Sequence, residues 1–153
     1  IPRIGAVCTV IAGDEHLSGF IDTRGDFVLQ FDQGEGLSPA GGYGDGLFPV
    51  TDIRKQLELG ECSRGYMDRD GNWVIEPQFC RVGAFHDGLA PVSTSEENVF
   101  PPLGYINTRG RYVIPEQYDY ASDFSGGCAR VAWDGFKGIG LIDMDGDLIY
   151  EYP

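Results

Sequence analysis

Short apolar and aromatic segments, separated by turns that contain glycine, make up most of the chain. The clearest copy of this pattern is residues 65–75 (GYMDRDGNWVI), and it returns at residues 19–29 (GFIDTRGDFVL), 104–114 (GYINTRGRYVI) and 140–149 (GLIDMDGDLI). Apolar and polar positions alternate on both sides of each turn, which is typical of half-buried antiparallel strands. The sequence therefore predicts four β-hairpins.

A second pattern interleaves with the hairpins. Its clearest copy is residues 85–92 (FHDGLAPV), which matches residues 43–50 (YGDGLFPV), residues 124–131 (FSGGCARV) and, in degenerate form, residues 7–10 (VCTV). The copies recur every 39 to 42 residues, a period that indicates a repeat architecture. We expect a single domain of four tandem units, each a lone strand followed by a hairpin, with about three antiparallel strands per unit. The expected units are approximately residues 5–42, 43–84, 85–123 and 124–153.

Each hairpin turn has an Asp or Asn three residues before its glycine, namely Asp22, Asp68, Asn107 and Asp143. Such side chains accept hydrogen bonds from nearby backbone N–H groups, and the glycine supplies the left-handed conformation that closes the turn. Residues 68–72 and 143–147 also look faintly like calcium loops. They lack the ligand series and the later Glu that an EF-hand requires. We therefore interpret the carboxylates as turn residues and expect no metal site.

No window of the chain has helical periodicity over three turns, so we predict an all-β fold. The four units form either a curled β-solenoid or a small propeller-like ring, and the sequence leaves both open. Pro49 and Pro91 suggest that the lone strand is an edge strand or has a bulged end, because proline has no N–H for a ladder. Aromatic residues recur at fixed repeat positions, and we expect them in the cores between units. They are Phe20, Phe27, Tyr66, Trp73, Phe79, Phe85, Tyr105, Tyr112, Tyr118 and Phe124.

The two interleaved patterns resemble the WG-repeat family, also called KWG repeats, of bacterial proteins built from tandem units. Residues 65–92 match the family pattern almost throughout, and residues 104–131 match it with Asn107 in place of Asp and Cys128 in place of Leu. The first and last units follow it less closely. The resemblance implies a recognition scaffold without a shared catalytic motif, and some members of the family lie within toxin–immunity systems. We therefore expect neither an enzyme nor a bound cofactor.

The charge of the chain narrows the class of partner. Asp and Glu outnumber Lys and Arg by 24 to 11, which gives a net charge of −13. This charge disfavours nucleic-acid binding because it repels phosphates, and it favours rapid association with a basic protein. The same acidity is also explained as a means of keeping a protein with sheet edges soluble. No apolar run approaches the length of a membrane span, so we expect none.

Departures from the repeat are the best guide to a binding surface. The connection from lone strand to hairpin is longer in the two central units, at residues 51–64 and 93–103, and equivalent insertions emerge on one face of a repeat protein. Both insertions combine acidic with apolar residues, which suits protein recognition, although solvent loops without a function explain them equally. The predicted partner-binding residues are Asp52, Leu57, Glu58, Glu61, Glu96, Glu97 and Phe100.

The cysteines bear on the compartment in which the protein works. Cys62 and Cys80 flank the second hairpin, and they form a disulfide in an oxidising compartment or remain small apolar residues in cytosol. Cys8 and Cys128 are expected to be buried. None of the four has the spacing of zinc ligands, and His86 is expected to be a solvent-exposed loop residue.

Two functions follow from these observations. The first is a non-catalytic protein-binding module, most concretely an acidic immunity protein that neutralises a bacterial toxin by occluding its active site. The second is a cell-surface or periplasmic module that binds a glycan or small molecule through aromatic grooves. A disulfide between Cys62 and Cys80 favours the second function, and reduced thiols with a basic protein partner favour the first. The cytoplasm is slightly favoured over the periplasm.

Overall fold

The structure is a computed structural model that describes residues 4–12, 15–32, 34–97 and 99–153, and in this part of the chain four antiparallel sheets follow one another. The first sheet contains β1 (Ile4–Ala12), β2 (Glu15–Asp22) and β3 (Phe27–Phe31) in that order. The second contains β4 (Leu37–Pro39), β5 (Phe48–Asp52), β6 (Arg64–Met67) and β7 (Trp73–Phe79), with helix α1 (Ile53–Leu59) between β5 and β6. The third contains β8 (Arg81–Val82), β9 (Leu89–Ser93), β10 (Leu103–Asn107) and β11 (Tyr112–Tyr118). The fourth contains β12 (Tyr120–Ala121), β13 (Cys128–Trp133), β14 (Gly138–Asp143) and β15 (Leu148–Glu151).

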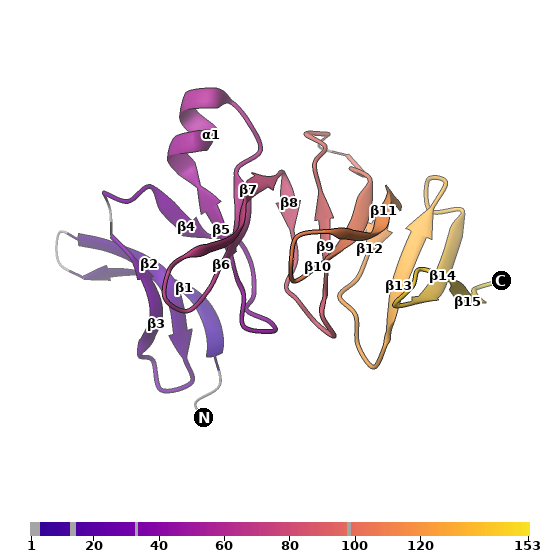
Figure 1. Cartoon of the computed structure of the whole chain (residues 1–153), viewed down its shortest axis with the longest axis horizontal. Helices are drawn as coiled ribbons and strands as arrows, with labels where there is room; N and C mark the ends of the chain where they lie inside the picture. The colour runs from indigo at the N-terminus through magenta and orange to yellow at the C-terminus, as the bar shows by residue number, and fades with distance from the viewer. Residues whose placement is uncertain (1–3, 13–14, 33, 98) are drawn as a thin grey trace.

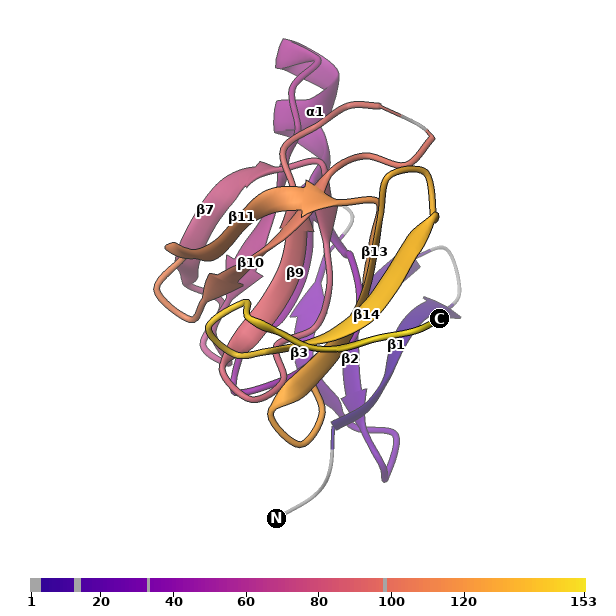
Figure 2. The same cartoon turned by 90° about the vertical axis from the view of Figure 1, so that its right-hand side faces the viewer.

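The predicted all-β repeat fold is confirmed, and the sheets form an open row. They follow one another along the longest axis of the molecule, with the first sheet at one end and the C-terminus at the other (Figure 1). Seen from the C-terminal end, the last sheet lies in front of the earlier ones (Figure 2). Among the described residues the row does not close into a ring, so the open arrangement is the one observed.

Each of the last three sheets has four strands, one more than the sequence predicted. The extra strand is the short β4, β8 or β12 at the start of the unit. A single residue, Cys80, separates β7 from β8. Its backbone N–H already donates to the carbonyl of Ser93 in the next sheet, at 2.8 Å. Strands of two or three residues are too short to leave an alternating pattern, so sequence periodicity missed them.

Of the two alternatives predicted for the proline-containing strands, an edge position or a bulged end, the edge position was wrong. Strands β5 and β9 are internal, and Pro49 and Pro91 pair with Tyr66 and Tyr105 on the hairpin side. The carbonyl of Pro91 still accepts a hydrogen bond, at 2.8 Å, from Gly83, the residue that follows β8. The N–H that proline lacks would point toward this same short strand. The short strand therefore ends opposite the proline, where the hydrogen-bond ladder loses a donor.

Neighbouring sheets bury apolar cores between them, and the cores use equivalent repeat positions. Between the second and third sheets, the rings of Tyr66 and Phe85 meet edge to face with centroids 4.7 Å apart. Tyr105 and Phe124 repeat this pair between the third and fourth sheets at 4.8 Å. All four side chains are buried, so the predicted inter-unit core is confirmed at these positions. The ring of Tyr112 is an exception, because 44% of this residue is exposed.

The two core tyrosines also bind backbone carbonyls. The Tyr66 hydroxyl donates to the carbonyl of Gly83 at 2.8 Å, and the Tyr105 hydroxyl donates to the carbonyl of Ser122 at 2.6 Å. Each bond fastens a hairpin to the segment that enters the next unit. Buried phenol hydroxyls need such a partner, and these two tyrosines therefore fix the stacking of units as well as fill the core.

The hairpin turns have the predicted chemistry. In the second unit the Asp68 carboxylate accepts the N–H groups of Asp70 and Asn72, both at 2.9 Å, and Gly71 has a φ of +81°. Equivalent bonds are made by Asp22, Asn107 and Asp143. The repeated carboxylates are thus occupied by backbone N–H groups of their own turns.

A second set of turns links one unit to the next through a side chain. The Asp45 carboxylate accepts the N–H of Gly88 at 2.8 Å, and Asp87, beside that glycine, accepts the N–H of Gly127 in the fourth unit at 2.9 Å. This ladder runs along one edge of the row of sheets. Gly126 stands where another Asp would continue it.

Candidate partner-binding cleft

The first insertion, predicted to be a loop, contains the short helix α1. Asp52, predicted as a binding residue, caps this helix by accepting the N–H of Lys55 at 3.0 Å. At the other end Gly60 has a φ of +65° and donates its N–H to the carbonyl of Gln56. Caps satisfy the free backbone groups of a helix end. Two turns are too few for a detectable helical period.

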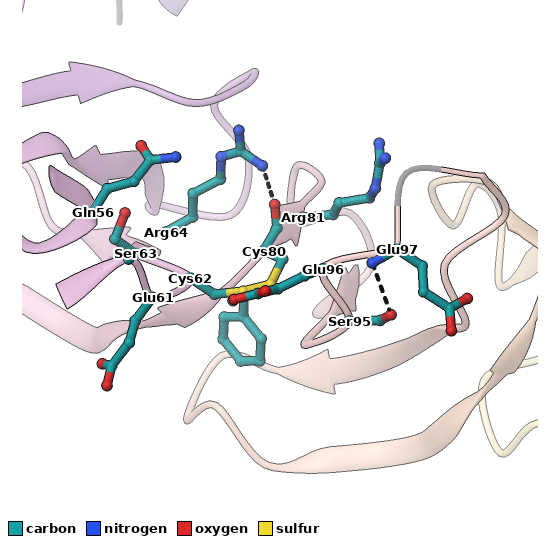
Figure 3. A pocket seen from close by; sticks show the side chains of 12 residues that line it. Gln56, Glu61, Cys62, Ser63, Arg64, Cys80, Arg81, Ser95, Glu96 and Glu97 are labelled. Atoms are coloured by element: carbon teal, nitrogen blue, oxygen red, sulfur yellow. Dashed lines mark hydrogen bonds between the residues drawn. A yellow bond between two sulfur atoms is a disulfide. The ribbon is translucent and has the colours of Figure 1, made fainter.

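The two insertions lie next to each other on the same side of the molecule. Helix α1 and the connection between β9 and β10 both project from one edge of the row, in both views (Figures 1 and 2). Between them lies an open cleft of about 470 Å³. Its lining residues are Gln56, Gly60, Glu61, Cys62, Ser63, Arg64, Phe79, Cys80, Arg81, Ser95, Glu96 and Glu97 (Figure 3).

A disulfide crosses the floor of the cleft. It joins Cys62, after α1, to Cys80, between β7 and β8, with the Cα atoms 4.4 Å apart (Figure 3). The guanidinium of Arg64 donates to the carbonyl of Cys80, and the ammonium group of Lys55 donates to that of Pro77 at 2.6 Å. The first insertion is thus fastened to the junction between the second and third sheets. Cys128, expected to be buried, is partly exposed because it follows directly on a surface turn.

The opposite wall is held by side-chain hydrogen bonds. The Glu116 carboxylate on β11 accepts the backbone N–H of Thr94 at 2.7 Å and its hydroxyl at 3.2 Å. It also accepts the hydroxyl of Tyr112 at 2.5 Å. Burial raises the pKa of Tyr112, and the bond to Glu116 and the charge of that carboxylate raise it further. The second insertion therefore begins from a fixed position.

The seven predicted binding residues do not all meet at the cleft. Glu61, Glu96 and Glu97 line it. Leu57 and Glu58 lie on the exposed helix, where 80% of Leu57 is accessible to solvent.

Phe100 points to a neighbouring element instead. Its ring meets that of Phe136 at 5.0 Å, edge to face, and Phe136 belongs to the turn between β13 and β14. Both residues have a positive φ, +51° and +65°, and both remain at least 40% exposed. The exposed surface beside the cleft thus continues onto the fourth unit.

Sequence reasoning missed the two arginines of the cleft, Arg64 and Arg81. They begin strands β6 and β8, and both also line a second open hollow that includes Asp123. Their signal was a departure from the repeat, because the equivalent positions of the next unit hold Leu103 and Tyr120.

His86 is half-exposed in a turn, as predicted, with its Nε2 atom 3.6 Å from the Asp123 carboxylate. Burial raises the pKa of Asp123, and the nearby His86 partly offsets that shift. The phenol groups nearby, Tyr66 and Tyr105, already donate to backbone carbonyls. We therefore interpret the His86–Asp123 pair as a weak polar contact between units.

The sheets around the cleft match a known family. A model described as WG containing repeat matches residues 65–96 and residues 104–132. The chain therefore contains WG repeats. The two matched segments run from β6 into the second insertion and from β10 to β13, so the cleft lies beside the best-conforming repeats. WG repeats are generally non-catalytic repeat modules. No curated protein matches the chain.

The helix content of the fold is small. Among the residues that the structure describes, no helix has the length and apolar character needed to cross a membrane.

Proposed function

We propose that the chain is a non-catalytic protein-binding module whose partner contacts the cleft and the two insertions that flank it. One observation carries this proposal: the two longest departures from the repeat lie side by side and project from the same edge of an otherwise regular scaffold. Loops that project from a rigid scaffold are the usual place for recognition.

The exposed side chains of the insertions suit a protein partner. Leu57, Leu59, Val99 and Phe100 are all more than half exposed, at 54–80%. Glu58 and other carboxylates stand among them. Apolar anchors within a polar rim are typical of protein interfaces.

The net charge of −13 favours a basic partner, whose approach it would accelerate. In its narrowest form, the proposal is an immunity protein that occludes the active site of a basic bacterial toxin. An acidic surface suits that role because it can occupy a site that normally binds a polyanion. An enzymatic role has no support from the repeat, since the repeated Asp and Asn residues are used in turns.

The disulfide supports a location in an oxidising compartment, an observation that favours the second of the two functions, the cell-surface or periplasmic module. The other half of that hypothesis, a glycan groove built from the repeated aromatics, is not supported. Tyr66, Phe85, Tyr105 and Phe124 are buried between sheets and offer no stacking surface. We therefore retain protein binding and move its expected compartment from the cytoplasm to the periplasm or cell exterior.

A charge-reversal experiment tests the proposal. The variant Glu61→Lys/Glu97→Lys changes a residue on each wall of the cleft, and Asp70→Lys/Asp145→Lys introduces the same change of charge in exposed hairpin turns. Both variants and the unchanged chain are used to capture proteins from the source organism at low and high salt. We expect one basic partner, lost at high salt and lost with the cleft variant alone. Equal capture by both variants, or the absence of a protein partner, would contradict the proposal.

A further inference from the structure

Three potential metal ligands meet on the floor of the cleft. The sulfur atoms of Cys62 and Cys80 and a carboxylate oxygen of Glu96 all lie within 4.8 Å of one another. We propose that, once the disulfide is reduced, these three side chains bind a zinc ion. This proposal concerns the chain alone and does not rest on the proposed partner.

The geometry is close to that of a zinc site. Bonds of about 2.3 Å to sulfur and about 2.0 Å to oxygen, in a tetrahedral arrangement, place the ligand atoms roughly 3.5–3.8 Å apart. Reduction of the disulfide lets the sulfurs of Cys62 and Cys80 separate to that distance, and the Glu96 oxygen, already within 4.8 Å of both, needs to approach by no more than about 1 Å. The carbonyl oxygen of Thr94 lies 3.2 Å from the Cys80 sulfur and 3.8 Å from the Cys62 sulfur. This oxygen or a water molecule completes the four ligands.

The segment that leads to Glu96 is held in place by hydrogen bonds. Two residues earlier, Thr94 is fixed by the carboxylate of Glu116, at 2.7 Å and 3.2 Å. The Ser93 hydroxyl accepts the N–H of Ser95 at 3.1 Å and so shapes the intervening turn. A ligand that is held by neighbouring hydrogen bonds loses little freedom when it binds a metal.

The charge of the site is also compensated. Two thiolates and a carboxylate carry three negative charges, and a zinc ion leaves one of them unbalanced. Arg64 and Arg81 line the same cleft, and the Arg64 guanidinium donates to the carbonyl of Cys80 (Figure 3). In a chain with only 11 Lys and Arg residues, these two cations supply the positive charge that such a site needs.

The disulfide and the metal site exclude each other because they use the same sulfurs. A dithiol reductant transfers two electrons and two protons to the Cys62–Cys80 bond, which gives two thiols and leaves the reductant as a disulfide. Zinc binding then releases the two thiol protons to solvent. The cleft would therefore have two covalently distinct forms: an oxidised form without metal and a reduced form with zinc.

The test uses the full chain with Cys8→Ser/Cys128→Ser, so that only the proposed ligands remain as thiols. The chain is reduced with a dithiol, freed of reductant under anaerobic conditions, and titrated with Zn²⁺ against a chromogenic chelator and with Co²⁺ by absorption. We expect one metal ion per reduced chain, with thiolate-to-cobalt absorption, and no binding by the oxidised chain. Absence of stoichiometric binding by the reduced chain overturns the proposal.

Two matched variants identify the carboxylate. Glu96→Gln should weaken zinc binding by about tenfold or more, since even residues that merely support a ligand change affinity by about 10–100-fold. Glu97→Gln, in the same exposed segment, should leave the affinity unchanged. Both residues are exposed, so both substitutions should leave the fold intact. Equal affinities of the two variants would overturn the assignment of Glu96, and binding that survives Cys62→Ser would overturn the site.

Discussion

Removal of the Cys62–Cys80 disulfide should destabilise the fold by an amount that follows from its position in the chain. The cysteines are 18 residues apart. In the chain-entropy model, a cross-link over such a loop removes about 11 cal/mol/K from the unfolded ensemble, or about 3 kcal/mol at 25 °C. We therefore expect the free energy of unfolding of the variant Cys62→Ser/Cys80→Ser to be about 3 kcal/mol lower than that of the oxidised chain.

Urea unfolding, followed by circular dichroism in the presence of a metal chelator, measures this difference. For a slope of about 2 kcal/mol/M, the expected loss lowers the midpoint by about 1.5 M urea. Cys128→Ser is the matched control, because Cys128 is partly exposed and outside any disulfide, and it should shift the free energy of unfolding by no more than about 0.5 kcal/mol. If the double variant is as stable as the oxidised chain, the cysteines do not form the cross-link that fastens the first insertion.

Three further predictions concern the contacts between units. Tyr66→Phe removes a buried hydroxyl and leaves the carbonyl of Gly83 without its donor. Unfolding in urea should therefore show a free energy of unfolding lower by about 1–2 kcal/mol. Asp87 accepts the N–H of Gly127 and has a positive φ, which glycine tolerates, so Asp87→Gly removes the acceptor without straining the backbone. The same assay should show a free energy of unfolding lower by about 0.5–1 kcal/mol. Burial raises the pKa of Tyr66 and of Tyr105, so the unfolded chain loses these protons first. Stability should hold up to about pH 10 and then fall by about 1.4 kcal/mol per pH unit for each tyrosine, as measured by unfolding between pH 9 and 11.5; constant stability over that range would contradict the buried positions of the two rings.

The repeat itself could be predicted from the sequence because local structure requires the residue types that recur in it. Asp68 and Gly71 are required by the turn that they form, and Tyr66 recurs because each unit must bury a ring against the next. Such residues leave a periodic signal even in a single sequence. The short strands β8 and β12 leave none, because two residues are too few for alternation and only their pairing with the next strand along the chain defines them.

The cleft could be predicted only as a region. Insertion lengths indicated where the scaffold departs from its pattern, and Glu61, Glu96 and Glu97, which were predicted in this way, line the cleft. The arginines were missed because Arg64 and Arg81 belong to regular strands. They meet at the cleft because the chain passes from one sheet to the next at Cys80.

The cleft follows from a difference between equivalent junctions of one scaffold. At the junction between the third and fourth sheets, the position of Cys80 is taken by Asp119, whose carboxylate accepts the N–H of Gly135 at 2.8 Å. That junction therefore fastens a nearby loop with a hydrogen bond, whereas the preceding junction fastens one with a covalent bond. Because the backbone pairing is the same at both, with Cys80 and Asp119 each donating an N–H to the next sheet at 2.8 Å, the fold does not require the cysteine. Its presence together with Cys62 is best explained by the cleft that the disulfide holds in place.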